Sequence, residues 1–164
     1  MAVTNKPGFS VLTAQEYNDL IALARPLRAD KTGNESTAGT TLQDDDHLFL
    51  ALESPAIYDI NLLLWITAPA AQDFKLGFTT PTSPGGFWTV KNTALAATAG
   101  TVFQSPLAWS AGATLEGSAS DIVVEIFGVI DTSSAAGTLR LQWAANTAGT
   151  VSVLKYSTMI GRKH

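Results

Sequence analysis

Asp44, Asp45, Asp46 and His47 form the one cluster in this sequence whose residue types could do chemistry. Three carboxylates in a loop can gather around a hard cation such as Ca²⁺, so the aspartates are a weak candidate metal site. The alternative is a turn, in which aspartates cap and solvate the entry to a strand that begins at His47. The glycine and the distant glutamate of an EF-hand loop are absent, which favours the turn.

Other constellations of reactive residues are missing. His47 and His164 are the only histidines, and neither has the spacing of an HExxH zinc motif. No GxSxG segment supplies a nucleophilic serine, there is no cysteine, and the segment from Ser83 to Gly86 lacks the glycine spacing and the lysine of a phosphate loop. We therefore expect a protein that is not an enzyme, with no cofactor and no metal beyond the weak candidate above.

The sequence contains four tryptophans, and for two of them either sugar binding or core packing is open. Trp88 and Trp109 lie near predicted turns, where an exposed indole ring could stack on a sugar and a buried one would pack in a core or an interface. Trp143 continues the apolar face of Leu139 and Leu141, so we expect it in the core.

Apolar residues that recur with a period of two predict the elements that position these side chains. Leu48, Leu50 and Leu52 share one strand face, and a longer apolar row follows at the even positions of 58–66. Leu63 and Trp65 lie on the other face of that second strand, which indicates a strand near the sandwich centre or in an oligomer interface. Further strands are predicted around 74–78, 87–91, 101–103 and 121–130, with a possible edge strand at 27–30.

The last third of the chain, from Gly137 to Ile160, predicts a β-hairpin. One strand alternates around Trp143, a turn follows at 146–149, and a second strand begins with Val151 and Val153. In all, about eight or nine short strands are separated by turns rich in glycine, serine and proline. This pattern predicts an all-β fold, an antiparallel β-sandwich of jelly-roll type preceded by an N-terminal arm and one short α-helix.

The N-terminal segment differs from the rest. Residues 1–12 have no periodicity and contain Pro7 and Gly8, so they predict an extended arm. Thr13 and Glu16 have the spacing of a capping box, and an apolar stripe follows at positions 17, 20, 21 and 24 before Pro26 ends the helix. So short a helix is marginal alone and must pack on the sandwich or on a neighbour. We divide the chain into an arm and helix at 1–27 and a β-sandwich at 28–164.

The composition limits the partners. Charged residues make up 15% of the chain and hydrophobic residues 46%, a balance that favours a surface partly covered in an assembly. The net charge of −4 provides no basic field for nucleic acid or for an anionic membrane. Neither a signal peptide nor a membrane span is visible, so we expect a soluble protein.

Four segments in series resemble a family of virion structural proteins of tailed, chiefly actinobacterial, bacteriophages. They are LTAQEYNDL at 12–20, TTLQDDDHLFLAL at 40–52 with AIYDINLLLW after it, DFKLGFTTP at 73–81 and GTLRLQWAANT at 137–147. The resemblance implies a small β-sandwich protein, commonly a homotrimer, that is either a decoration protein of the head or a minor protein of the tail. It also implies the virion as location, with assembly in the host cytoplasm.

The residue patterns and the resemblance together give one hypothesis. The sandwich trimerises through apolar strand faces, with Leu63 and Trp65 as interface residues, and the three N-terminal segments bind the major capsid protein. Three linked weak contacts hold more tightly than one. The hypothesis assigns the capsid-docking surface to Lys6, Pro7, Phe9, Val11, Leu12, Tyr17, Leu20, Ile21 and Arg25.

The alternative is a minor tail or fibre protein that attaches to a host-surface glycan. In that case Trp88, Trp109 and the loops at 79–86 would contact the sugar. A glycan-degrading enzyme is a more distant possibility, because no acid pair flanking a groove can be assigned.

Overall fold

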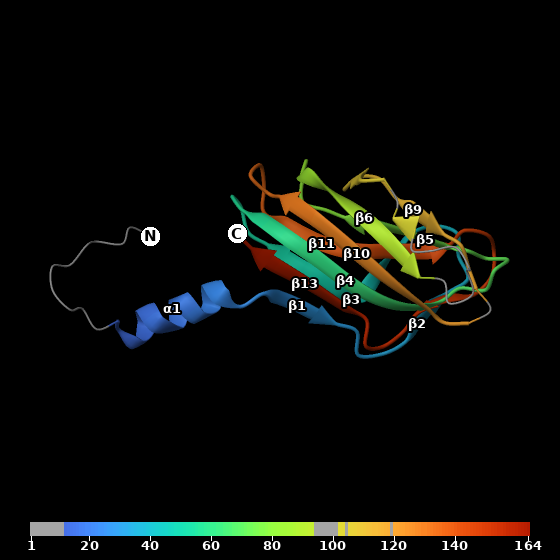
Figure 1. The fold of residues 1–164 in the computed structure, drawn as a ribbon, viewed down its shortest axis with the longest axis horizontal. Coiled ribbons are helices and arrows are strands. Elements are labelled where there is room, and N and C mark those ends of the chain that lie inside the picture. The colour runs from blue at the N-terminus through green and yellow to red at the C-terminus, as the bar shows by residue number, and fades with distance from the viewer. Residues whose placement is uncertain (1–11, 94–101, 104, 119) are drawn as a thin grey trace.

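Two antiparallel β-sheets face each other in the computed structural model, and one helix precedes the first strand (Figure 1). The structure describes residues 12–93, 102–103, 105–118 and 120–164. The helix α1 spans Ala14–Ala24. The strands are β1 (Leu27–Asp30), β2 (Glu35–Thr37), β3 (Gln43–Leu52), β4 (Ile57–Thr67), β5 (Phe74–Thr79), β6 (Gly85–Thr93), β7 (Val102–Phe103), β8 (Leu107–Ala108), β9 (Ala113–Leu115), β10 (Ile122–Asp131), β11 (Gly137–Ala145), β12 (Val151–Val153) and β13 (Thr158–Lys163).

The strand pairing is that of a jelly roll. The four-stranded sheet has the order β3-β11-β5-β9, and the nine-stranded sheet contains β4, β10, β6 and β8 as neighbours. The chain therefore forms nested antiparallel pairs, β3 with β11, β4 with β10, β5 with β9 and β6 with β8. Successive pairs alternate between the sheets, as in two Greek keys rolled into one sandwich. The predicted all-β antiparallel sandwich of jelly-roll type is confirmed.

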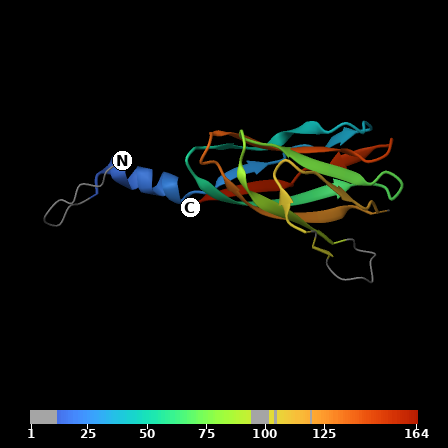
Figure 2. The ribbon, with the colours of Figure 1, turned by 90° about the horizontal axis from the view of Figure 1, so that it is seen from above.

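The remaining strands extend the nine-stranded sheet on both sides of these pairs. β13 and β12 pair with successive parts of β4. β1 then pairs with β13, and β2 pairs with β12. β7 pairs with β6 at the other side. Because β1 and β13 are antiparallel neighbours, α1 extends from the end of the sandwich where the C-terminus lies (Figures 1 and 2).

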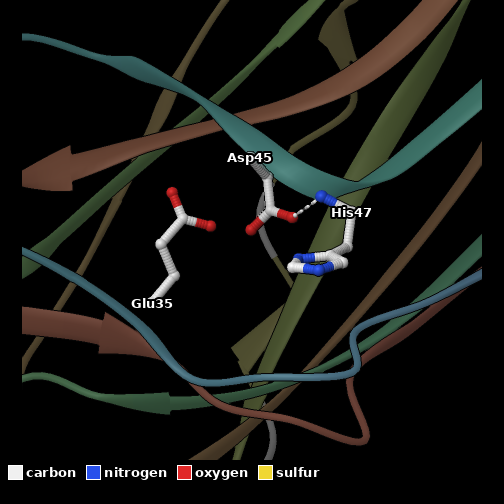
Figure 3. Close-up of side chains that lie close together, drawn as sticks. All are labelled: Glu35, Asp45 and His47. Atoms are coloured by element: carbon white, nitrogen blue, oxygen red, sulfur yellow. Dashed lines mark hydrogen bonds between the residues drawn. The ribbon is translucent and has the colours of Figure 1, made fainter.

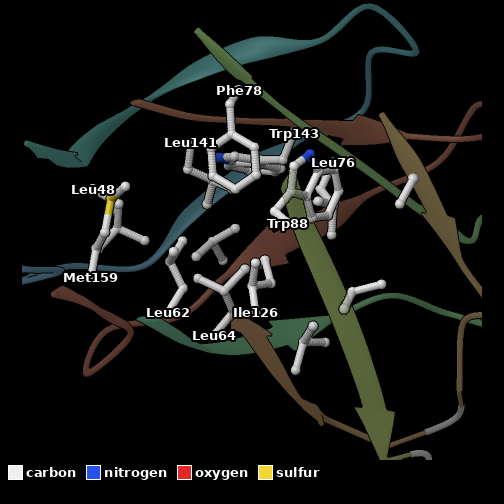
Figure 4. Close-up of a cluster of buried hydrophobic side chains, with 14 of the residues drawn as sticks. Leu48, Leu62, Leu64, Leu76, Phe78, Trp88, Ile126, Leu141, Trp143 and Met159 are labelled. Atoms are coloured by element: carbon white, nitrogen blue, oxygen red, sulfur yellow. The ribbon is translucent and has the colours of Figure 1, made fainter. Parts of the chain in front are cut away.

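The inward faces of the two sheets enclose one apolar core (Figure 4). Every second residue of β4 is at most 3% exposed, as the alternation predicts. Phe74 stacks on Trp143 with ring centroids 5.8 Å apart, and Phe78 contacts Trp88 and Trp109 edge-on at 5.2 Å each. Aromatic pairs in these geometries add stability beyond the area that they bury.

The predicted hairpin between residues 137 and 160 is wrong, although its two strands exist. β11 belongs to the four-stranded sheet and β12 to the nine-stranded sheet. Both edges of β11 are already paired, with β3 and with β5, so no edge is left for β12. The intervening turn crosses between the sheets, and the N–H groups of Asn146 and Thr147 both donate to the carbonyl of Gln72.

The helix α1 begins as predicted and packs on no strand in the described part of the chain. The Thr13 hydroxyl accepts from the N–H of Glu16 at 3.2 Å, and the Glu16 carboxylate accepts from the N–H of Thr13 at 2.8 Å. This capping box satisfies two backbone donors at the helix start. Leu12, Tyr17 and Leu20 are each more than half exposed. The sandwich therefore leaves these three apolar side chains uncovered.

Candidate functional site

A buried ion cluster lies between the two sheets, formed by Lys31, Glu35, Asp45 and Trp143 and here called the Lys31 cluster. Lys31 follows β1, and its ammonium Nζ lies 2.7 Å from Asp45 Oδ2 and 2.6 Å from Glu35 Oε2. The side chains of Lys31 and Asp45 are both 0% exposed. Buried charges of this kind persist only when they are paired and hydrogen-bonded.

The Asp45 carboxylate is held at both oxygens. Oδ1 accepts from the backbone N–H of His47 at 2.9 Å (Figure 3) and from that of Leu48 at 2.9 Å. Oδ2 accepts from the indole N–H of Trp143 at 3.1 Å and from Lys31. With four donors around it, this carboxylate is fixed in position and orientation.

A bulge in β3 turns Asp45 inward. Phe49 pairs with Arg140, but Asp44 pairs with Gln142, so residues 44–49 of β3 lie opposite residues 140–142 of β11. In this stretch β3 has three more residues than β11. Because three is an odd number, the residues before the bulge face the opposite way from the alternation that Leu48 and the later leucines set up. Asp45 then faces the core while Asp44 is exposed.

The three aspartates therefore do not converge on one point, and the predicted metal site at Asp44, Asp45 and Asp46 is wrong. Asp44 and Asp46 are exposed, and Asp44 accepts from Thr79 and Gln142 at 2.9 Å on the outer surface. The alternative, a turn before a strand that begins at His47, is wrong in its boundary, because all three residues lie within β3. Its capping role holds for Asp45, which accepts from the backbone N–H groups of His47 and Leu48.

A different set, Glu35, Asp45 and His47, brings possible ligand atoms within 4.8 Å of one another (Figure 3). The Lys31 ammonium, however, contacts both carboxylates directly. It provides the positive charge that a metal ion would provide, so a metal could enter only by displacing it. His47 Nδ1 is buried without a hydrogen-bond partner. The Lys31 ammonium nevertheless contacts both carboxylates, so a metal ion would still have to displace it.

The outer face of the nine-stranded sheet exposes a group of large apolar side chains, here called the outer apolar face. Val129 lies opposite Asp59 on one side and Phe87 on the other, and Phe127 lies opposite Asn61 and Thr89. A shallow groove runs over these residues. The exposed members are 40 to 61% exposed and are Ile57, Trp65, Phe87, Phe127 and Val129.

The two predicted interface residues lie on this same face. Trp65 is exposed beside Val123, and Leu63 is half-buried beside Glu125. The even-numbered residues of β4 turn inward, so the strand has two apolar faces as predicted. Phe87, Phe127 and Val129 were not among the predicted interface residues, because only the register of β10 with β4 and β6 brings them together.

The predicted docking residues fall into two groups. Lys6, Pro7, Phe9 and Val11 lie outside the described residues. Of the others, Leu12 precedes α1 and its N-cap, Tyr17, Leu20 and Ile21 lie within the helix, and Arg25 directly follows it. Ile21 is half-buried and the other four are exposed.

Trp88 and Trp109 are not available for stacking on a sugar. Each is 1% exposed. Their indole N–H groups donate to the carbonyls of Ala108 at 3.1 Å and Val129 at 2.9 Å. The assignment of these two residues as glycan contacts is therefore wrong, and both belong to the core, as does Trp143.

Two exposed ion pairs show shifted pKa values. The hydrogen bond from Arg28 lowers the pKa of the Asp30 carboxyl and raises that of Arg28. In the same way the hydrogen bond from Lys163, 2.7 Å long, lowers the pKa of the Glu53 carboxyl and raises that of Lys163. The first pair joins two residues of β1, and the second joins the end of β13 to the residue after β3, so both shifts have a structural cause.

Comparison of the chain with family models and with curated proteins found no match in either case. The resemblance to phage virion proteins accordingly remains a prediction. Within the described ranges, no helix has the length and apolar character needed to cross a membrane.

Proposed function

We propose that this chain is a bacteriophage virion structural protein that decorates the head as a cement protein. In this proposal the sandwich forms a homotrimer, and the N-terminal segment with α1 binds the major capsid protein. The observation that carries it is α1, a capped helix with exposed apolar side chains and no packing on its own sandwich.

The helix is the part of the molecule that needs a partner. It has 11 residues, and helices of this length are marginal in water without a packed apolar face. Tyr17 and Leu20 lie three residues apart and so share one side of the helix. A capsid surface with an apolar groove would bury both side chains and stabilise the helix.

The outer apolar face supports the second half of the proposal. Exposed apolar residues grouped on one sheet, in a chain with only 15% charged residues, are typical of a surface covered by another subunit. A trimer would then present three copies of α1 together, and linked contacts raise the apparent affinity without any new interaction.

A minor tail protein that binds host glycan is the second candidate, and the groove over Phe87 and Phe127 favours it. Its lining also includes Asp59, Asn61 and Thr89, so rings that could stack on a sugar lie beside polar groups that could bind its hydroxyls. Glycan binding and trimer formation would use the same outer apolar face, so one copy of that face cannot serve both.

Co-sedimentation with purified phage heads tests the first proposal. We expect the full chain to sediment with heads and a Tyr17→Ser/Leu20→Ser variant to remain in the supernatant. Asn18→Ser is the matched control, because Asn18 is exposed on the same helix but polar, and it should bind like the parent chain. Equal binding of the double variant and the parent would contradict docking through α1, and binding of the parent to a host-glycan array instead of heads would support the second candidate.

A further inference from the structure

The Lys31 cluster holds an amine, a carboxyl group and a second carboxylate in the arrangement that amide formation requires. We propose that Lys31 Nζ and the Asp45 side chain join in an intramolecular isopeptide bond, with Glu35 as the proton carrier. This inference is independent of the proposed role in the virion, because it rests on contacts inside the sandwich.

The nucleophile and the electrophile are in contact. Lys31 Nζ lies 2.7 Å from Asp45 Oδ2, an oxygen bonded to the carboxyl carbon that the nitrogen would attack; such an attack takes place from a separation of about 3–3.5 Å. The Lys31 backbone is fixed as well, since its N–H donates to Ser157 and its carbonyl accepts from Tyr156. Both reacting side chains are fully buried, so water neither solvates their charges nor competes for the carbon.

Asp45 Oδ1 lies in a ready-made oxyanion hole. Attack on the carboxyl carbon places negative charge on the oxygen that stays, and Oδ1 already accepts from the N–H groups of His47 and Leu48 at 2.9 Å. Two backbone donors at this distance stabilise such a charge without reorganisation. The bulge in β3 supplies both donors, because it turns consecutive N–H groups toward the Asp45 side chain.

Glu35 is placed to move the proton. Its Oε2 lies 2.6 Å from Lys31 Nζ and can accept a proton, which leaves a neutral amine as nucleophile. Glu35 Oε1 is held by the Gln43 amide at 3.1 Å. The Trp143 N–H donates to Asp45 Oδ2, the oxygen that leaves as water.

The reaction balances without any other reagent. The ammonium of Lys31 and the carboxylate of Asp45 give one amide and one water. The bond from the carboxyl carbon to Oδ2 breaks, and a bond from that carbon to Nζ forms. Two protons pass from the nitrogen to Oδ2. One moves through Glu35 before the attack, so that the carboxyl group under attack is neutral, and the other moves as the water departs; Glu35 ends as a carboxylate. No electrons are gained or lost, and the net charge of the pair is zero before and after.

The bond would join the two sheets covalently. Lys31 directly follows β1 of the nine-stranded sheet, while Asp45 belongs to β3 of the four-stranded sheet. The chain has no cysteine and therefore no disulfide. An amide at this place would close a loop in the unfolded chain and so restrict it, as a disulfide does.

Intact-mass spectrometry of the purified, denatured full chain is the decisive measurement. We expect a mass that is lower than the sequence mass by one water, after allowance for removal of Met1. Digestion and fragmentation should then yield one branched peptide that links Lys31 to Asp45. A mass equal to that of the sequence, from a chain shown to be folded before denaturation, would overturn the proposal and leave a simple ion pair.

Two controls assign the chemistry. Glu35→Gln keeps the shape of the side chain but cannot carry the proton, so most of this variant should retain the full sequence mass; complete bond formation in it would overturn the role of Glu35. Lys163 and Glu53 form the internal control, because their 2.7 Å contact is equally short but solvent-exposed. A water loss that maps to this exposed pair would show that proximity alone suffices and would overturn the argument from the buried cluster.

Discussion

Gly128 of β10 leaves room for two tryptophan side chains. A Cβ atom at this position would lie 2.7 Å from Trp109 Cζ2 and 2.9 Å from Trp88 Cβ. Both tryptophans are buried in a close-packed core, so neither can move away freely. We expect Gly128→Ala to lower the free energy of unfolding by about 1–3 kcal/mol, measured by denaturant titration with tryptophan fluorescence.

Gly33→Ala is the matched control for this substitution. A Cβ at Gly33 would meet no atom within 4 Å, and the backbone there does not have a positive φ. Removing glycine at such a site restricts mainly the unfolded chain, so the control should be unchanged or more stable by up to about 1 kcal/mol. Equal losses of stability in the two variants would contradict tight packing at Gly128.

Asp45 shows what the sequence could and could not predict at a single residue. The run from Asp44 to His47 contains Asp45, but the partners of Asp45 are distant in the sequence, since Lys31 is 14 residues away and Trp143 is 98 residues away. Nothing in the local pattern indicates those contacts. The alternation set by Leu48 would also place Asp45 on the outer face, and only the bulge against β11 reverses it.

The strand β13 is fastened at the surface by Lys163, which pairs with Glu53 beyond the end of β3. The pKa of Glu53 is lowered below its ordinary value of 4.5, and that of Lys163 is raised above its ordinary value of 10.5. The pair therefore stabilises the fold fully between these two values. Its contribution is lost as the pH falls below 4.5 through the folded-state pKa of Glu53, and as the pH rises above 10.5 through that of Lys163.

A Glu53→Gln variant tests this dependence on pH. We expect it to be slightly less stable than the parent chain at neutral pH, because the pair is exposed to solvent. The difference in denaturation midpoint should shrink as the pH falls below 4.5, since both chains are then without the Glu53 charge. A difference that stays constant down to strongly acidic pH would show that the carboxylate is not its cause.

At the level of elements, the sequence predicts those features whose contacts join residues close together in the chain. The capping box of α1 joins residues three apart, and the helix begins where Thr13 and Glu16 predict. β13 was missed, because its inward positions, Met159 and Gly161, provide only one large apolar side chain. β12 was predicted but assigned to the wrong partner, because turn residues alone do not show whether a chain folds back or crosses to the other sheet.

For the whole molecule, the outer apolar face predicts self-association. Phe127 lies near its centre, between β4 and β6, and is 40% exposed. We expect the parent chain to sediment as a trimer and Phe127→Ser to weaken that association about tenfold or more, as the loss of a central aromatic contact does. Sedimentation velocity over a range of concentrations measures both.

Phe49→Ser provides the comparison for this experiment. Phe49 is 42% exposed, but it lies on β3 of the other sheet, beneath the Arg140 guanidinium. Its replacement should leave the trimer intact. If both variants dissociate equally, or if the parent chain is a monomer at all concentrations, the outer apolar face is not the subunit interface.

The class of the fold was predictable from the sequence, because period-two alternation and turn residues recur along most of the chain. The strand order was not predictable, since the partner of β3 is β11, and no local pattern marks that pairing. The same limit applies to the outer apolar face. Trp65 could be selected from its own strand, whereas only the sheet register shows that Phe87 and Phe127 lie on the same outer face.

Immunogold electron microscopy of phage particles, from the culture whose DNA encodes this chain, tests whether the protein lies on the phage head. An antibody to the sandwich domain leaves α1 free to remain bound to the capsid. We expect gold distributed over the surface of the head. Gold confined to the end of the tail would contradict the cement role and support attachment to the host, and particles without gold on either part would contradict a place in the virion.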